Sequence, residues 1–447
     1  MYAIGMDGNL KLIKKLLKVL TLVVGAIIII VGVLMVMASK YNGIWSTEGY
    51  GLCLKANFGI VKMYGVTNNY YTDIDAYKGV IVNNTLYCGM GKFKLSQQGE
   101  KLTLYDEGSR YTYCANRQEK DYLTSLKKVG TKDQAEKFKM YSEAIKENYP
   151  FADMYGMDVD EEYNKYSSKI TEETPDETLY SYMCNMVNKL DDGHVEISWG
   201  DMVYSPADYL PEWMKDRDQV NSVVSIIKNN YLHNYYKFND CFIRYGEIRE
   251  DIGYIIVQAL GMEEIDKSAS TKKAMDKIIK EFKDRDTIVI DLRLCEGGYD
   301  EASLLIAGYF APEKYLAYKK QAYNKGEYTE LQSIYVEPMD MTYDGEVIII
   351  TSGYTISAGE TFARAMVANK NNSITVIGET TAGYYSDAIP MFLPGDYTYA
   401  MSNERYYWYD DTLLEGKGIV PDIEIPYSYN AVQMGKDPAL EWILDNR

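Results

Sequence analysis

The period of hydrophobic and polar positions changes three times along the chain. Residues 19–38 are apolar almost throughout, residues 41–118 alternate over short runs, and residues 119 to about 189 show helical spacing. From residue 251 onward, β-branched apolar runs alternate with amphipathic helical stretches. Such apolar runs are typical of buried parallel strands, and their alternation with helices predicts an α/β fold with a covered, mostly parallel sheet.

The strands and helices of this last part can be placed individually. We expect strands at 253–257, 287–293, 347–351 and 374–377, and helices at 268–283, 301–310 and 360–369. In a parallel sheet of this kind, sites lie beyond the carboxyl ends of the strands. Gly297, Gly298, Ser357 and Gly383 all follow a predicted strand directly or by a short turn.

Ser357 stands between the apolar run Val347–Ile350 and a stretch with helical periodicity. A serine at the beginning of a helix is well placed for chemistry, because free N–H groups and the helix dipole favour a developing oxyanion. The same pattern is also typical of a simple N-cap serine. The stretch alone therefore leaves a catalytic and a structural interpretation open.

The apolar run at 19–38 is long enough to span a bilayer. Lys11, Lys14, Lys15 and Lys18 precede it, which predicts a cytoplasmic segment 1–18 and an extracytoplasmic remainder. We favour an uncleaved single-pass anchor in the cell membrane. The alternative is a signal peptide cut near Ala38, which would make the protein secreted.

Three further units are expected after this helix. The short alternating runs of 41–118 predict a small all-β domain, either an antiparallel sheet or a barrel, acting as a binding module or a spacer. Residues 119–199 form a helical subdomain that ends in Asp191-Asp-Gly-His194, and residues 200–447 form the core. Residues 198–252 are too short for a convincing PDZ domain.

Composition narrows the chemistry. The net charge of −18 argues against nucleic acid as a partner. Six cysteines without a CxxC pair or a Cys/His cluster predict neither zinc nor another metal, and no cofactor is expected; one disulfide among the first three cysteines stays open. With only His194 and His233 in the chain, a histidine mechanism must use one of them. We assign His233 to the surface or to packing.

Four blocks occur in a telling order: Leu190-Asp-Asp-Gly-His194; Asp291-Leu-Arg-x-x-x-Gly-Gly298; Thr351-Ser-x-x-Thr-x-Ser-Ala-Gly-Glu360; and Gly378-Glu-x-Thr-x-Gly383 with Gly416-x-Gly-Ile-x-Pro-Asp422. Together they make the chain resemble the C-terminal processing (tail-specific) protease family, which includes the tricorn core protease. The resemblance covers about residues 140–430. It implies a ClpP/crotonase-like core with helices around a mostly parallel sheet.

The resemblance also implies a site. One branch of the family places a lysine directly after the glycine of the Gly-Glu-x-Thr-x-Gly block, where this chain has Tyr384. The tricorn-like branch uses a serine, the histidine of the Asp-Gly-His block and a late glutamate, which correspond here to Ser357, His194 and Glu415. Three other carboxylates compete for the last role: Glu360, Glu379 and Glu404.

Backbone N–H groups of Gly298 and Ala358, with Gly297 beside them, are the expected oxyanion donors. Cys295 stands where the family often has asparagine. The implied function is a membrane-anchored extracytoplasmic serine endopeptidase that forms an acyl-enzyme with unfolded protein or peptide substrates. The alternatives are a non-catalytic ligand- or peptide-binding member of the same fold, or an anchored binding protein centred on residues 41–118. The sequence makes no prediction of the oligomeric state.

Overall fold

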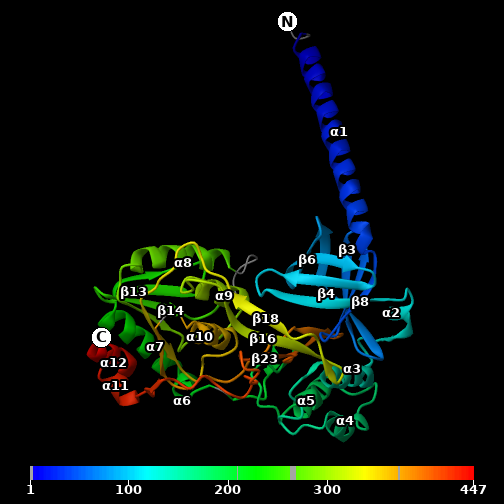
Figure 1. Cartoon of the computed structure of the whole chain (residues 1–447). Coiled ribbons are helices and arrows are strands. Elements are labelled where there is room, and N and C mark those ends of the chain that lie inside the picture. The colour runs from blue at the N-terminus through cyan, green and yellow to red at the C-terminus, as the bar shows by residue number, and fades with distance from the viewer. Residues whose placement is uncertain (1–3, 209, 262–267, 371–372) are drawn as a thin grey trace.

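The computed structural model of the chain describes residues 4–208, 210–261, 268–370 and 373–447. A long N-terminal helix, an all-β domain and a larger α/β body follow one another along the chain (Figure 1). The helix projects away from the β domain, and the β domain packs beside the α/β body (Figure 1).

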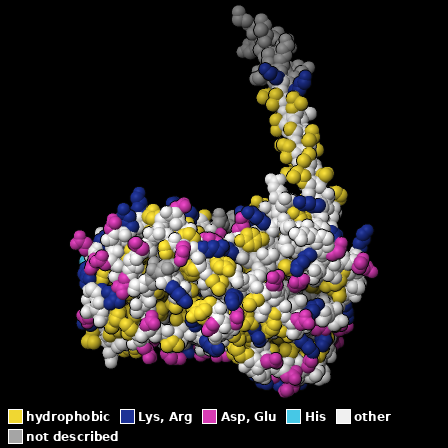
Figure 2. Space-filling model, in the orientation of Figure 1, with side chains coloured by type: hydrophobic (Ala, Val, Ile, Leu, Met, Phe, Trp, Pro, Cys, Tyr) yellow, Lys and Arg dark blue, Asp and Glu magenta, His cyan; other side chains and the backbone are white. Residues whose placement is uncertain are grey.

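The projecting helix α1 comprises Ile4–Ala38 and is followed by a short 3-10 turn, Ser39–Tyr41. The most apolar 18-residue stretch within Lys15–Tyr41 has a mean hydropathy of 3.2. Apolar side chains cover the described part of this helix in the view of Figure 2, and most of those between Leu16 and Met37 are exposed. The helix is therefore long and apolar enough to cross a membrane, and the expected span 19–38 lies within it.

The β domain is a closed barrel of eight antiparallel strands. The strands are β1 Gly43–Thr47, β2 Leu52–Asn57, β3 Ile60–Val66, β4 Tyr70–Val82, β5 Thr85–Cys88, β6 Gly91–Gln98, β7 Lys101–Asp106 and β8 Tyr111–Gln118. The order β3-β2-β1-β8-β7-β6-β5-β4 is closed by a β3–β4 pairing, so these strands leave no open edge. Asn83 and Asn84 (φ 49° and 62°) form the β4–β5 turn, as expected for a type I′ hairpin. The predicted all-β domain is confirmed, and its form is the barrel.

A helical segment connects the barrel to the core. It comprises α2 Tyr122–Ser125, β9 Lys127–Lys128, α3 Gln134–Asn148, α4 Val159–Ser167 and α5 Asp176–Met186. Helix α5 follows Pro175 and buries Leu179, Met183 and Met186. The next strand, β10 Glu196–Trp199, pairs with the late strand β22 Tyr397–Ala400. This pairing brings the Asp-Gly-His block to the C-terminal half of the chain.

The α/β body is built on a seven-stranded sheet of order β12-β13-β14-β15-β19-β20-β24. Its strands are β12 His233–Lys237, β13 Ile243–Arg249, β14 Ile252–Val257, β15 Thr287–Asp291, β19 Glu346–Thr351, β20 Ile374–Gly378 and β24 Ile423–Glu424. Strands β14 to β24 run parallel, whereas β12 and β13 are antiparallel additions at one edge. Residues 233–249 thus extend the sheet.

Alternate side chains of the central strands enter two separate hydrophobic cores. In β15, Ile288 and Ile290 face one core and Val289 faces the other. The first core is covered by α8 Ala269–Phe282, α9 Asp300–Gly308 and α10 Ala358–Ala368. The second is covered by α7 Arg217–Ile226, α11 Tyr429–Gln433 and α12 Pro438–Asn446. A strand buried on both faces needs the continuous apolar runs that the sequence shows, so the mixed α/β prediction is confirmed.

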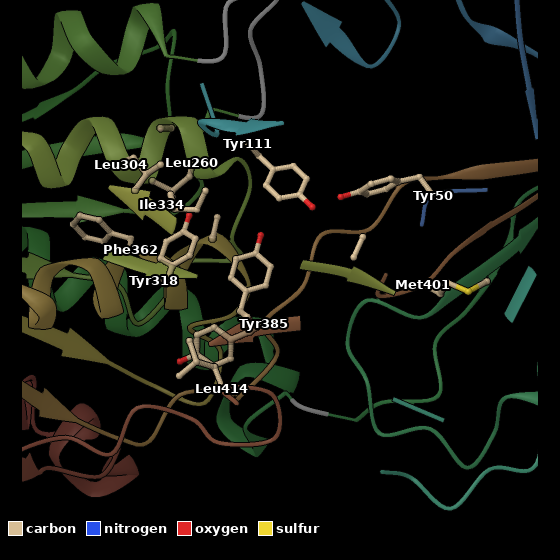
Figure 3. Close-up of a cluster of buried hydrophobic side chains, with 14 of the residues drawn as sticks. Tyr50, Tyr111, Leu260, Leu304, Tyr318, Ile334, Phe362, Tyr385, Met401 and Leu414 are labelled. Carbon is tan, nitrogen blue, oxygen red and sulfur yellow. The ribbon is translucent and has the colours of Figure 1, made fainter. Parts of the chain in front are cut away.

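Short strands connect this body to the barrel. β16 Tyr315–Asn324 pairs with β17 Glu327–Tyr328, β18 Gln332–Val336 and β23 Glu404–Tyr407, while β11 Met202–Tyr204 and β21 Met391–Leu393 complete the small sheet around β10 and β22. At this junction the hydroxyl ends of two barrel tyrosines, Tyr50 and Tyr111, point toward one another (Figure 3). The hydroxyl of Tyr77 donates to the carbonyl oxygen of Pro390 at 2.6 Å. The barrel and the α/β body therefore share one continuous core.

Candidate active site

Ser357 occupies the turn between β19 and α10. Its φ of 56° and ψ of −124° are those of the first central residue of a type II′ turn, where glycine is favoured. The N–H of Gly359 closes the turn by donating to the carbonyl oxygen of Ile356 at 2.9 Å. Holding a side chain in such a backbone conformation costs about 1–3 kcal/mol. The strained turn keeps the serine hydroxyl at the N-terminal end of α10.

The turn is anchored to the loop that follows β15. Thr355 Oγ1 donates to the carbonyl oxygen of Leu292 at 2.9 Å. The N–H of Ile356 donates to the carbonyl oxygen of Cys295 at 3.3 Å. Both loops lie beyond the carboxyl ends of neighbouring parallel strands, which is where the sequence predicted the site.

His194 reaches the serine from the loop between α5 and β10. Its Nε2 lies 3.0 Å from Ser357 Oγ, within hydrogen-bonding distance. Asp192 Oδ1 accepts the N–H of His194 at 2.8 Å, which fixes the loop. At Gly193, an added Cβ would lie 2.6 Å from Cδ2 of Tyr384, so the close packing of this loop needs glycine. The two predicted residues are therefore brought together, although 163 positions separate them.

The other ring nitrogen of His194, Nδ1, is buried and has no hydrogen-bond partner among the described residues. Asp192 Oδ1 is 3.7 Å away, close enough for charge attraction but too far for a hydrogen bond. Asp192 itself is fully buried, and its Oδ2 accepts the hydroxyl of Tyr149 at 3.0 Å. An imidazolium at His194 would thus be formed beside a buried carboxylate.

Glu415 is also buried in this region, but no hydrogen bond joins it to His194 in the described chain. Its Oε2 accepts the N–H of Tyr385 at 2.7 Å, and its Oε1 accepts the hydroxyl of Tyr155 at 3.4 Å. Burial raises the pKa of Glu415 well above its usual range, and the charge of Asp192 raises that pKa further. Glu415 therefore lies within the electrostatic reach of the Asp-Gly-His loop.

The three competing glutamates have separate environments. Glu360, in the first turn of α10, accepts Thr381 Oγ1 at 2.5 Å and the N–H groups of Gly383 and Tyr384 at 2.8 Å each. Burial raises the pKa of Glu360 to about 7. Glu379 accepts a backbone N–H from the segment after β24, and Glu404 is paired with a buried lysine at the barrel junction. Of the three, only Glu360 is bound next to the nucleophile.

The glycine loop at 297–298 lies directly against Ser357. An added Cβ at Gly297 would lie 2.8 Å from Cβ of Ser357, so glycine is required at this approach. The N–H of Gly297 donates to the sulfur of Cys295. In contrast, the N–H groups of Gly298 and Ala358 have no acceptor among the described residues. Of the three predicted oxyanion donors, Gly298 and Ala358 are thus the two that are available.

Cys295 packs beneath α10. Its side chain is fully buried, and an added Cβ at Gly359 would lie 3.0 Å from its sulfur. Burial raises the pKa of the Cys295 thiol to about 12, so it stays neutral and unreactive at neutral pH. None of the six cysteines forms a disulfide, so the disulfide that the sequence left open is absent; all six lie in described segments.

Two residues near the site were not assigned by the sequence reasoning. Tyr384, which stands where the other branch has lysine, donates its hydroxyl to Asp191 Oδ1 at 2.8 Å and packs on Gly193. Asp192 is the carboxylate nearest to His194 Nδ1. Both belong to quoted motifs, but sequence spacing does not tell which way their side chains point. His233 is exposed on β12.

A serine hydroxyl beside an imidazole nitrogen, with free backbone N–H groups at a helix N-terminus, is the arrangement of a serine hydrolase. Residues 251–425 match the sequence profile of peptidase family S41. The chain therefore carries a peptidase family S41 domain, which identifies it as a peptidase of the serine type. The resemblance inferred from its motifs is confirmed at the level of the family.

Comparison with solved structures finds chains similar in fold. A candidate peptidase from Parabacteroides merdae is 21% identical, with a TM-score of 0.58, and the match covers 71% of this chain and 96% of that one. Mature CPAF complexed with lactacystin is 10% identical, with a TM-score of 0.52, covering 71% and 97%. The photosystem II D1 C-terminal processing protease is 13% identical, with a TM-score of 0.45, covering 66% and 93%. No curated protein matches the chain by sequence.

Proposed function

We propose that the chain is a membrane-anchored, extracytoplasmic serine endopeptidase that acts on unfolded or peptide segments. The observation that carries the proposal is the 3.0 Å approach of His194 Nε2 to Oγ of the strained Ser357. A serine in an unfavourable backbone conformation, pointed at a partly exposed imidazole, has no evident structural purpose. Strain of this kind gathers at functional sites.

In the proposed mechanism, His194 Nε2 takes the proton from Ser357 Oγ as that oxygen attacks the scissile carbonyl carbon. The resulting oxyanion accepts hydrogen bonds from the N–H groups of Gly298 and Ala358. The imidazolium then gives its proton to the leaving amine, and an acyl-enzyme remains. Water, deprotonated by His194, hydrolyses the ester and regenerates the serine.

Glu415 is the proposed third member, and it would stabilise the imidazolium through the buried acidic cluster that it shares with Asp192. A movement that brings its carboxylate to Nδ1 on substrate binding would complete the hydrogen bond. Catalytic hydrogen bonds often tighten only in the substrate complex.

We further propose a ClpP/crotonase-like architecture for the core at 200–447, with residues 41–118 and 119–199 as separate units. The apolar surface of α1 supports its role as the anchor. Extraction of membranes with alkaline carbonate checks the anchoring, because an integral protein stays in the pellet.

Labelling with a fluorophosphonate probe tests the catalytic proposal. The full chain in detergent should be labelled, whereas Ser357→Ala should not, and His194→Ala should react much more slowly. The matched control is His233→Ala, since that histidine is exposed on β12 and should leave labelling unchanged. Labelling of His194→Ala at the parental rate would remove the histidine as the base.

A further inference from the structure

A cleft of about 550 Å³ lies next to the candidate active site, between the β12–β13 hairpin and the α6–α7 segment, where α6 is Glu212–Lys215. Leu294, Glu296 and Tyr354 form the wall that faces the site. Glu296 directly precedes the glycine that contacts Ser357, and Tyr354 belongs to the nucleophile turn. A chain bound in this cleft would therefore continue directly into the catalytic residues.

Hydrogen bonds hold the wall of the cleft together. The backbone of Gln258, just after β14, donates its N–H to Phe242 and accepts the N–H of Glu296, both at 3.0 Å. The Tyr354 hydroxyl donates to Glu296 Oε2 at 3.3 Å. The hairpin loop, the glycine loop and the nucleophile turn are thus tied to one another around the cleft.

The cleft is basic in a strongly acidic protein. Arg217, Lys237 and Arg244 line it, and none of the three has an ion-pair partner among the described residues. Lys215 also lines it but is neutralised by Asp208 and Glu212, each at 2.9 Å. Glu296 is the one carboxylate in the lining. Three unpaired cations against one anion give this cleft a positive potential, although the chain as a whole carries −18.

Apolar side chains accompany these charges. Met214, Val220 and Phe238 line the cleft and are each partly exposed. A mixed apolar and cationic lining matches a peptide segment that carries both apolar and carboxylate side chains. Complementary charge at such a site contributes chiefly to specificity and to the rate of association.

We propose that this cleft is the substrate-binding subsite of the peptidase and that it selects peptide segments rich in Asp and Glu. This inference rests on the proposed function and adds the class of substrate. The recognised groups are side-chain carboxylates, held by Arg217, Lys237 and Arg244. The acidic surface elsewhere repels such segments, so the cleft is where they are retained.

Binding to the Ser357→Ala full chain in detergent tests this without any need for turnover. The probes are fluorescein-labelled decapeptides, acetylated and amidated at their ends, that contain four Asp/Glu residues or their Asn/Gln counterparts. Fluorescence anisotropy at low salt should show about tenfold tighter binding of the acidic peptide, and the difference should shrink at 1 M salt. Equal binding of the two peptides, or tighter binding of the neutral one, overturns the proposal.

Two charge-matched double variants locate the effect. Lys237 and Arg244 are register partners across β12 and β13, so Lys237→Gln with Arg244→Gln should abolish the preference. Lys55 and Lys62 are register partners across β2 and β3 in the barrel, and their double Gln variant should keep it. Loss of the preference in both pairs alike, or in neither, contradicts the assignment. If the Lys237/Arg244 double variant unfolds, the preference is measured instead with Arg217→Gln, which lies at the exposed start of α7.

Two further measurements distinguish the possible causes of tighter peptide binding. A neutral decapeptide with a free carboxyl terminus should bind no better than its amidated form; a preference that appears only with the free terminus shows recognition of chain ends and overturns the proposal. Fluorophosphonate labelling of the parent is measured in parallel. Preference for the acidic peptide without labelling supports acidic-peptide binding in the cleft and refutes the peptidase mechanism. Labelling without that preference supports the mechanism and refutes the proposal for the cleft.

Discussion

The strained backbone at Ser357 predicts that removing its β-carbon stabilises the protein. Ser357→Ala keeps the Cβ at φ 56°, whereas Ser357→Gly removes it. Relief of strain is worth about 2 kcal/mol, from the range of 1–3 for such conformations. The added freedom of glycine in the unfolded chain offsets about 0.7 kcal/mol, and the lost contact of a half-buried methyl offsets about 0.5 kcal/mol. The glycine variant should therefore be more stable than the alanine variant by roughly 1 kcal/mol.

Thermal unfolding of the two full-length variants in detergent measures this difference. Both variants lack the hydroxyl, so self-cleavage cannot bias the comparison. A gain of roughly 2–4 °C in Tm is expected for a domain of this size. The control is Ser222, half-buried in the middle of α7 with helical backbone. There glycine should be less stable than alanine by about 1 kcal/mol, the opposite sign. Glycine variants that are less stable at both positions would show that Ser357 is not strained.

Three other predictions concern buried charges. Lys320→Met should cost about 3–5 kcal/mol in thermal unfolding, because it leaves buried carboxylates unpaired, whereas Lys319→Met next to it should cost less than about 1 kcal/mol. Glu360 has a pKa near 7 when folded, so its protonated form stabilises the fold below pH 4.5, and this stabilisation is lost as pH rises through 7. The free energy of unfolding of the parent, compared with that of Glu360→Gln, should therefore fall by up to about 3 kcal/mol between pH 5 and 8. Glu415→Gln should lower kcat/KM on a fluorogenic peptide about 100-fold, and Asp192→Asn by less, because the proposed substrate complex brings Glu415 to Nδ1 of His194, whereas Asp192 Oδ1 lies 3.7 Å from that nitrogen, too far for a hydrogen bond. The reverse order would assign the third role to Asp192.

The sequence predicted the elements of the core well, because strands buried on both faces require long apolar runs. The strand expected at 287–293 is found at Thr287–Asp291, and the helix expected at 268–283 is α8, Ala269–Phe282. The expected neighbourhood of Ser357 and His194 follows from motifs that the fold brings together. A motif predicts such residues because their identity and spacing are set within a short stretch of the sequence.

Side-chain direction was harder to predict. The orientation of Glu415 toward Tyr385 and Tyr155 depends on packing between segments about 30 and 260 positions apart, which no local pattern encodes. The same holds for the basic cleft: Arg217 and Lys237 are unremarkable surface residues in the sequence, and only the fold sets them beside the nucleophile turn. Contacts between segments far apart in the chain therefore cannot be predicted from the pattern of a single sequence.

The junction between the barrel and the core indicates that the barrel is more than a spacer. Tyr50 of the barrel donates to Glu404 Oε1 at 2.5 Å, and Lys320, fully buried, lies 3.1 Å from Glu404 Oε2. Lys320 also donates to the hydroxyl of Tyr406 at 3.1 Å, which in turn donates to Asp300 Oδ2 at 2.9 Å.

Asp300 Oδ1 accepts a hydrogen bond from Oγ1 of Thr361 at 2.8 Å, and Thr361 lies in the first turn of α10, which Ser357 precedes. A continuous series of hydrogen bonds and one ion pair therefore runs from the barrel to α10. Buried polar networks are stable only when every member is satisfied. Loss of the barrel would remove Tyr50 from Glu404 and open the buried Glu404–Lys320 pair to water, so we expect the position of Ser357 to depend on the barrel.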